Sequence, residues 1–147
     1  MVKLLVFSLL LMLMNAGSAG WGEKLNCFSK GFGLIIVTDK AIYDSGQPIT
    51  INLTVFNYTK DTVSFTFTSS QRYDFFVSKE GREIWCWSSG KVFAQVIGEE
   101  KIKPGESLTY KETYLPQIKL SPGIYQVTGV FTSKVPLEAT IYIQIRK

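Results

Sequence analysis

Histidine is absent from this chain of 147 residues. Its absence excludes Ser-His-Asp and Cys-His catalysis and the zinc sites that contain histidine. Only two cysteines occur, Cys27 and Cys86, too few for a tetrahedral thiolate zinc site. The chain also lacks a GxxxxGKS or GxxxxGKT phosphate loop and a GxGxxG turn after a strand. These absences disfavour an enzyme, and they leave no residue to which a cofactor or a metal can be assigned.

Long runs of one charge are also missing. The chain has 16 basic and 12 acidic residues, a formal net charge of +4, and the signs are interspersed. No four consecutive residues are Lys or Arg, so the surface does not resemble one that follows a phosphate backbone. The acidic residues form no local motif for a glycosidase pair. We therefore expect no nucleic-acid partner and no catalytic residues.

The first 22 residues contain a single charge, at Lys3. An apolar run, LLVFSLLLMLM, follows this lysine, and small residues then lead to Ala19. This order is typical of a secretory signal peptide, residues 1–19, cut after Ala19. An uncleaved anchor is the alternative, and it would be the only membrane contact. Both interpretations predict a secreted or cell-envelope protein, with an N-terminal extension at residues 20–31 and one domain at residues 32–147.

The two cysteines are an even pair, which suggests a disulfide in an exported protein. A Cys27–Cys86 bond would close a loop of about 60 residues and add roughly 4 kcal/mol on the chain-entropy model. The alternative is two unpaired thiols.

Short β-branched and aromatic runs alternate with turn residues along the rest of the chain. We expect strands near residues 32–38, 49–57, 62–68, 73–78, 82–87, 93–97, 107–114, 125–131 and 139–145. No segment shows apolar residues at helical spacing over three turns. The sequence therefore predicts an all-β protein, an immunoglobulin-like antiparallel β-sandwich, in which Tyr125 forms a tyrosine corner.

The stretch SSQRYDFFVSKEGREIWCWSSG, residues 69–90, predicts an aromatic hairpin. A three-residue loop at residues 79–81, with Gly81 left-handed, would pair Ser78 with Arg82 and Phe75 with Trp85. This register places four aromatic side chains on one face: Tyr73, Phe75, Trp85 and Trp87. A two-residue loop at Glu80-Gly81 is the alternative, and it would scatter the aromatics over both faces.

The first register assigns roles to the two faces. We expect the four aromatics to belong to the core, together with Phe93 and Tyr125, rather than to a binding surface. Cys86 then points outward, where it could meet Cys27. Phe76 and Ile84 also point outward, and they either contact a protein partner or are covered by another segment.

Several blocks resemble one known family. SSQRYDFFV, GREIWCWSSGKVFAQ, the PGES turn at residues 104–107 and PGIYQVTG occur in the order of the BsuPI family, whose type member is an intracellular proteinase inhibitor. The resemblance covers residues 49–132. Its most specific parts are QRYDF at residues 71–75 and IWxWS at residues 84–88. It implies an immunoglobulin-like sandwich that inhibits subtilisin-type serine proteinases.

This sequence departs from that family at two points. The type member is intracellular, whereas this chain carries an export signal. The residue between the two tryptophans is typically basic in the family and is Cys86 here. No reactive-site motif carries over residue by residue.

Two functions remain in competition. The first is a proteinase inhibitor that acts by surface binding to a serine proteinase, with contacts at residues 115–121 or at a loop made by Ser88, Ser89, Gly90 and Lys91. The second is a non-catalytic, cell-envelope, immunoglobulin-like module that binds another protein.

Overall fold

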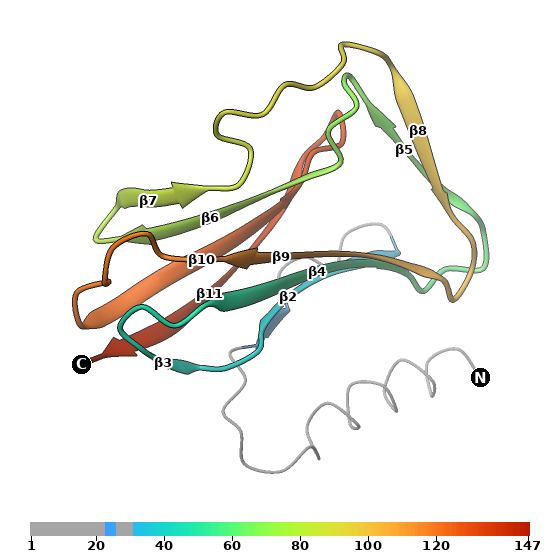
Figure 1. Ribbon diagram of the computed structural model, residues 1–147. Coiled ribbons are helices and arrows are strands. Elements are labelled where there is room, and N and C mark those ends of the chain that lie inside the picture. Colours follow the sequence, from blue (N-terminus) through green and yellow to red (C-terminus); the bar gives the residue numbers. More distant parts are fainter. Residues whose placement is uncertain (1–22, 26–30) are drawn as a thin grey trace.

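The computed structural model describes residues 23–25 and 31–147, and this part of the chain is built from strands (Figure 1). The strands are β1 Glu23–Leu25, β2 Phe32–Thr38, β3 Ile42–Asp44, β4 Ile49–Asn57, β5 Val63–Phe67, β6 Tyr73–Lys79, β7 Arg82–Cys86, β8 Gly98–Ile102, β9 Ser107–Tyr114, β10 Gly123–Phe131 and β11 Leu137–Arg146. The predicted all-β class is confirmed. Over these residues, no helix has the length and apolar character needed to cross a membrane.

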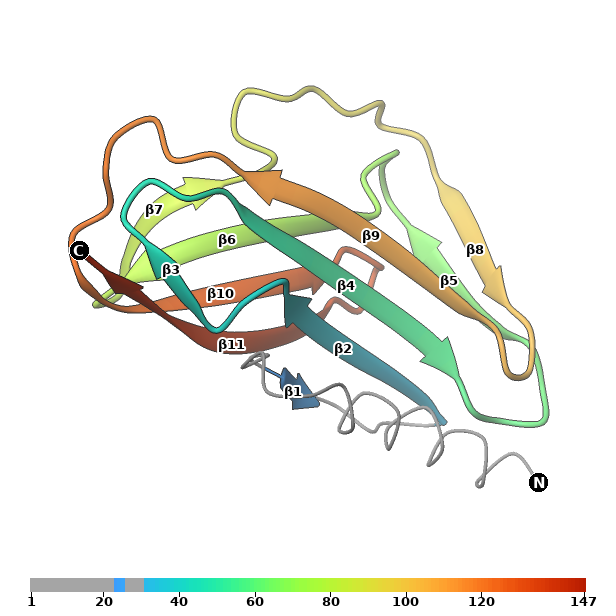
Figure 2. The ribbon, with the colours of Figure 1, turned by 60° about the horizontal axis from the view of Figure 1, so that its bottom comes forward.

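Two sheets form the layers of the sandwich. One has the order β1-β2-β4-β9 and the other the order β3-β11-β10-β6-β7. Figure 2 shows the four-stranded sheet in front of the five-stranded one. Neighbouring strands are antiparallel except β3, which runs parallel to β11. A separate ribbon of β5 and β8 closes one end of the molecule, on the right of Figure 1.

The core lies between the two sheets because inward residues alternate with outward ones. In β4, Ile49, Ile51, Leu53 and Val55 are buried and the residues between them are not. Gly129 in β10 shows how closely the sheets approach. A Cβ atom there would lie 2.9 Å from Leu53 Cδ1, so a larger residue would force the Leu53 side chain to shift.

The structure differs from the predicted strands in three places. Residues 93–97, predicted as a strand, form an irregular connection, while the unpredicted β8 follows at once. The sequence of β8, GEEKI, buries one apolar residue, Ile102, so it lacks a strand-like pattern. The short β3 was also unpredicted. The predicted signal segment, residues 1–19, lies outside the described residues; β1, from the predicted extension, pairs with β2.

Candidate protein-contact surface

The β6–β7 hairpin contains most of the residues singled out by the sequence. Its turn has two residues, Glu80 and Gly81, with φ of 51° and 76°. Lys79 pairs with Arg82 and Ser78 with Glu83. The predicted three-residue loop and its register are therefore wrong. Two consecutive positive φ angles are the type I′ geometry that follows the twist of a hairpin, which explains the shorter loop.

A β-bulge then restores the predicted faces. The register shifts between Ser78 and Val77, so that Val77 pairs with Trp85 and Ile84 has no partner across the strand. One extra residue in β7 moves every later side chain to the opposite face. The bulge therefore cancels the effect of the two-residue loop.

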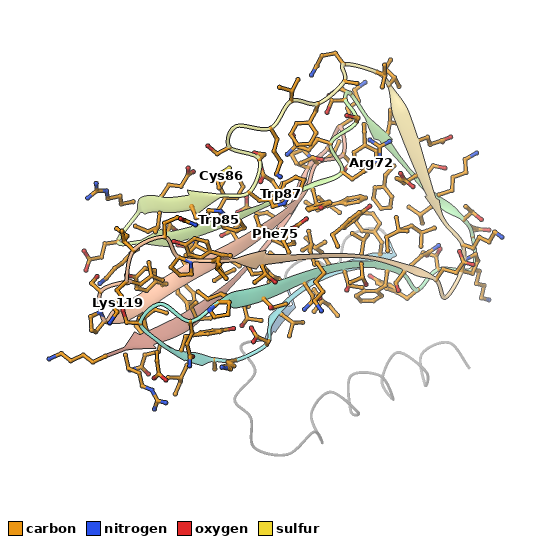
Figure 3. All side chains as sticks on the ribbon, viewed as in Figure 1. Arg72, Phe75, Trp85, Cys86, Trp87 and Lys119 are labelled. Carbon is orange, nitrogen blue, oxygen red and sulfur yellow. The ribbon has the colours of Figure 1, made fainter. Side chains whose placement is uncertain are left out.

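The structure places the four predicted aromatics on the inner face, in or against the core, and Figure 3 labels three of them, Phe75, Trp85 and Trp87. The aromatic cluster consists of Tyr73, Phe75, Trp85 and Trp87. The Tyr73 ring lies 4.4 Å from that of Trp87 and 5.5 Å from that of Phe75, centroid to centroid. Trp85 stacks on Tyr114 at 4.8 Å. Phe75 is fully buried, while both indoles are half-buried, so the cluster is mainly packing.

Burial also changes the acid–base chemistry of this region. The Tyr73 hydroxyl donates to Glu112 Oε1 at 2.6 Å. Burial first, and then the Glu112 carboxylate, raise the pKa of Tyr73 well above its usual range. Burial and the nearby Glu100 charge raise the pKa of Tyr110 to about 12, against a smaller opposing effect of Arg72. Both phenols therefore stay neutral further into the alkaline range than an exposed tyrosine does.

On the outer face of β6, Asp74 organises the chain that follows β7. Its side chain is only 7% exposed. Oδ1 accepts from the Ser88 N–H at 3.1 Å, and Oδ2 accepts from the Ser88 hydroxyl and from Gln71 Nε2. Because a buried carboxylate is costly unless it is hydrogen-bonded, these bonds fix Ser88 against the sheet. We name this contact the Asp74–Ser88 clamp.

Cys86 lies beside this clamp. Its thiol donates to both Asp74 carboxylate oxygens at 3.8 Å and lies 3.3 Å from Ser88 Oγ. The structure does not show the predicted Cys27–Cys86 disulfide: Cys86 is a free thiol, and Cys27 lies outside the described residues. The outward direction of Cys86 agrees with the expected face.

Residues 87–97, the β7–β8 connection, arch over the molecule at the top of Figure 1. Two turns open it, since Ser89 N–H donates to the Cys86 carbonyl and Lys91 N–H to the Ser88 carbonyl. Gly90, with φ of 77°, permits the second turn. The Lys91 ammonium lies 4.6 Å from the centre of the Trp87 ring. The predicted contact loop is therefore folded onto the aromatic cluster.

The second half of the β7–β8 connection is exposed and apolar. Val92, Val96 and Ile97 are 98%, 56% and 83% exposed. Phe93, predicted for the core, is instead half-buried outside it and packs on Trp87 with ring centroids 6.0 Å apart. Ala94 is held by Ser70: the Ser70 N–H donates to the Ala94 carbonyl at 2.8 Å, and the Ala94 N–H donates to Ser70 Oγ at 2.9 Å. We name this contact the Ser70–Ala94 clamp.

The other predicted contact segment is the β9–β10 connection, residues 115–122. Leu115 and Ile118 are exposed, but Leu120 is buried and its carbonyl accepts from Ser45 Oγ at 2.6 Å. The tyrosine corner is present, since the Tyr125 hydroxyl donates to the Ser121 carbonyl at 2.9 Å. This connection, too, is attached to the end of the sandwich, through Leu120 and Ser121.

The remaining predicted contact residues are spread over the outer side of the hairpin. Phe76 is half-buried beside Cys86, and Ile84 is 39% exposed at the bulge. Sequence reasoning missed Asp74, Ser70 and Val92. Asp74 had a usable signal, because an acidic residue between two aromatics in a strand needs buried partners. Over the described residues, no three Cys, Asp or Glu side chains are placed to hold a metal ion.

Comparison with known proteins gives one family. The model of the family described as "BsuPI: Intracellular proteinase inhibitor" matches residues 36–135. No curated protein matches the chain.

Solved structures that resemble this chain include Spo0M, the sporulation control protein of Bacillus subtilis. The identity is 14%, the TM-score 0.50, and the match covers 81% of this chain and 51% of Spo0M. A β-glucosidase of Erythrobacter marinus (EmGH1) matches at 13% identity and a TM-score of 0.45, over 78% of this chain and 15% of the enzyme. This chain thus spans about half of Spo0M and less of the enzyme. These likenesses concern the fold alone.

The family description also corrects the predicted location. The opening 22 residues suggested a secreted or cell-envelope protein. The matching family is named for an intracellular proteinase inhibitor, which points to the cytoplasm instead. The apolar run that suggested export lies outside both the described residues and the matched range.

Proposed function

Because the chain belongs to the BsuPI family of intracellular proteinase inhibitors, we propose that it blocks a subtilisin-type serine proteinase by binding to its surface. Membership in this family implies a protein partner such as a proteinase. The choice of a subtilisin-type target rests on the resemblance in the aromatic hairpin and the PGIY turn.

The observation that carries this proposal is that the β7–β8 connection is both exposed and held in place. Between Lys91 and Gly98 it has no strand pairing, and apolar side chains are exposed along it. It is nevertheless fixed, because the Asp74–Ser88 and Ser70–Ala94 clamps attach it to β6 and to the β5–β6 turn. An exposed and preformed segment is what binding to a proteinase cleft requires.

The mechanism needs no chemistry from this chain. An extended segment binds in a cleft through main-chain hydrogen bonds, and its side chains fill the adjacent pockets. Affinity improves when the segment is already ordered, because each side chain immobilised on binding costs about 0.5–1.5 kcal/mol. The rigid sandwich and the two clamps would lower that cost in advance.

Titration of a subtilisin-type proteinase with the purified full chain tests the proposal. We expect proteinase activity to fall in proportion to the added chain and to reach its minimum near equimolar ratio. Rapid degradation of the chain without loss of proteinase activity would overturn the proposal. Formation of a complex that leaves activity intact would instead support a non-inhibitory interaction module.

A further inference from the structure

Val92 has the most exposed large apolar side chain in the described part of the chain, at 98%. A single exposed apolar residue is common on protein surfaces and needs no function. Val92 differs because it lies in a short stretch fixed on both sides. The Asp74–Ser88 clamp precedes it by four residues, and the Ser70–Ala94 clamp follows it by two.

The residues beside Val92 are already engaged with the body of the protein. The Lys91 ammonium lies over the Trp87 ring, and the Phe93 ring packs against the same indole. Trp87 in turn packs on Tyr73 in the aromatic cluster. Val92 thus projects from a stretch in which both neighbouring side chains contact the half-buried Trp87 indole.

We propose that Val92 is the side chain that enters the primary pocket of the target, and that the target is an endoproteinase with an apolar primary pocket. This inference rests on the proposed function and adds the contact residue and the pocket chemistry. An acidic pocket would select Lys91, but that ammonium is held at the Trp87 ring.

The clamps give the protein a way to resist its target. Hydrolysis of the Val92–Phe93 bond would consume one water and leave a carboxylate on Val92 and an amine on Phe93. The Asp74–Ser88 clamp would hold the first end, while Trp87 packing and the Ser70–Ala94 clamp would hold the second. Since neither end could diffuse away, the cut would be disfavoured and the cleft would stay occupied.

The contact residue is tested with Val92→Asp and the matched variant Ile118→Asp in the full chain. Ile118 is 79% exposed on the rival β9–β10 connection. We expect Val92→Asp to weaken inhibition of a subtilisin-type proteinase by at least about 30-fold, the scale of a central contact residue. Ile118→Asp should leave inhibition within about twofold.

A loss of inhibition in Val92→Asp could also come from misfolding, so a second variant is designed to gain an activity. Val92→Lys should acquire inhibition of trypsin, whose primary pocket carries an aspartate. If the wild-type chain inhibits but neither Val92 variant changes its behaviour, this inference is overturned and the proposed function stands. If the wild-type chain inhibits neither proteinase, the proposed function itself fails, and this inference fails with it.

The clamps are tested with Ser88→Ala, and Thr109→Ala is the matched loss of a hydroxyl. Thr109 Oγ1 pairs with Thr54 Oγ1 at 2.8 Å on the outer face of the other sheet. Mass spectrometry after incubation with the proteinase should show a cut after Val92 in Ser88→Ala and an intact chain in Thr109→Ala. Equal resistance of the two variants would show that the Ser88 hydroxyl bond to Asp74 does not protect the chain.

Discussion

Two hairpins of the five-stranded sheet differ in how they set the direction of their side chains. In the β10–β11 hairpin, nine residues of β10 pair with β11 in an unbroken register from Gly123–Ile145 to Phe131–Leu137. The β6–β7 hairpin begins its register at Lys79–Arg82 and shifts it at Ile84. Both hairpins nevertheless bury an apolar inner face.

The difference shows that a side chain's face depends on the whole path from the turn. In β10–β11 the face follows from simple alternation, because every residue has one partner. In β6–β7 alternation alone, counted from the two-residue turn, would put Trp85 and Trp87 outside. The bulge at Ile84 returns them to the core and leaves the hairpin's outer face to Asp74 and Cys86.

The largest contrast in stability should come from deleting one residue in each hairpin. Deletion of Thr128, in the middle of β10, would turn one half of that central strand over and expose Phe131 or Val127. We expect it to abolish cooperative urea unfolding. Deletion of Ile84 would instead make the Ser78–Glu83 and Val77–Trp85 pairs continuous, and should cost about 1 kcal/mol.

Tryptophan fluorescence follows both deletions, since Trp85 and Trp87 report on the inner face of β7. The expected spectrum of the Ile84 deletion is that of the wild-type chain, in which both indoles of β7 and its end are half-buried. A red-shifted, solvent-exposed spectrum for this variant alone would mean that the bulge does not set the face of β7.

Alternation and turn residues were sufficient to predict the sandwich, the inner face of β4 and the tyrosine corner at Tyr125. They were sufficient because these strands pair without interruption and each has one buried face. The β6–β7 register could not be predicted in the same way. Glu80 adopts a positive φ, which is uncommon for a glutamate. The indoles that the bulge turns inward pack against Tyr114 and Tyr73, and such ring contacts leave no pattern in the sequence.

The contact surface was predicted only in part, for a related reason. Ser88–Lys91 was proposed as a loop that a Cys86 disulfide could brace, but its position depends on Asp74, 14 residues earlier. The Ser70–Ala94 contact likewise joins two irregular segments that have no period. Long-range contacts of single polar side chains leave no repeating pattern in a sequence.

The second largest effect should come from removing one ring on each inner face. Phe131 is fully buried and lies edge-on to Phe65 and Phe67 at 5.0 and 5.1 Å. Phe131→Ala should cost about 3–5 kcal/mol in the free energy of unfolding. Trp85→Ala should cost less, about 2 kcal/mol, because the indole is half-buried although it stacks on Tyr114. Urea unfolding of both variants measures the two losses in the free energy of unfolding. A larger loss for Trp85→Ala would mean that the inner face of β6–β7 contributes more to stability than that of β10–β11.

A smaller effect is expected where the β10–β11 hairpin begins. Tyr125→Phe keeps the buried ring and removes the hydroxyl that donates to the Ser121 carbonyl. We expect a loss of about 1 kcal/mol, the net contribution of one hydrogen bond. Inhibition should be unchanged, because the β9–β10 connection is not the proposed contact. A fall in inhibition that exceeds the fall in stability would instead favour this connection as the binding segment.

The smallest effect should be on the free energy of unfolding at alkaline pH, and it arises beside the β6–β7 hairpin. The inner face of β6–β7 meets tyrosines of β9: Tyr73 stacks on Tyr110 at 4.6 Å. The Tyr110 pKa is raised from 10.0 to about 12, mainly by burial. Unfolded chains would ionise this phenol from about pH 10, while folded chains keep it neutral, so stability is lost as pH rises from 10 toward 12.

Tyr110→Phe removes that loss. The variant should therefore show a shallower decline of the free energy of unfolding between pH 10 and 12 than the wild-type chain, with solvent screening keeping the difference modest. Urea unfolding at pH 7 and at several alkaline values measures it, and the pH 7 difference between the two proteins serves as the baseline. Parallel declines would mean that Tyr110 ionises equally in both states, so that the packing between the bulged hairpin and β9 does not exclude water from its hydroxyl.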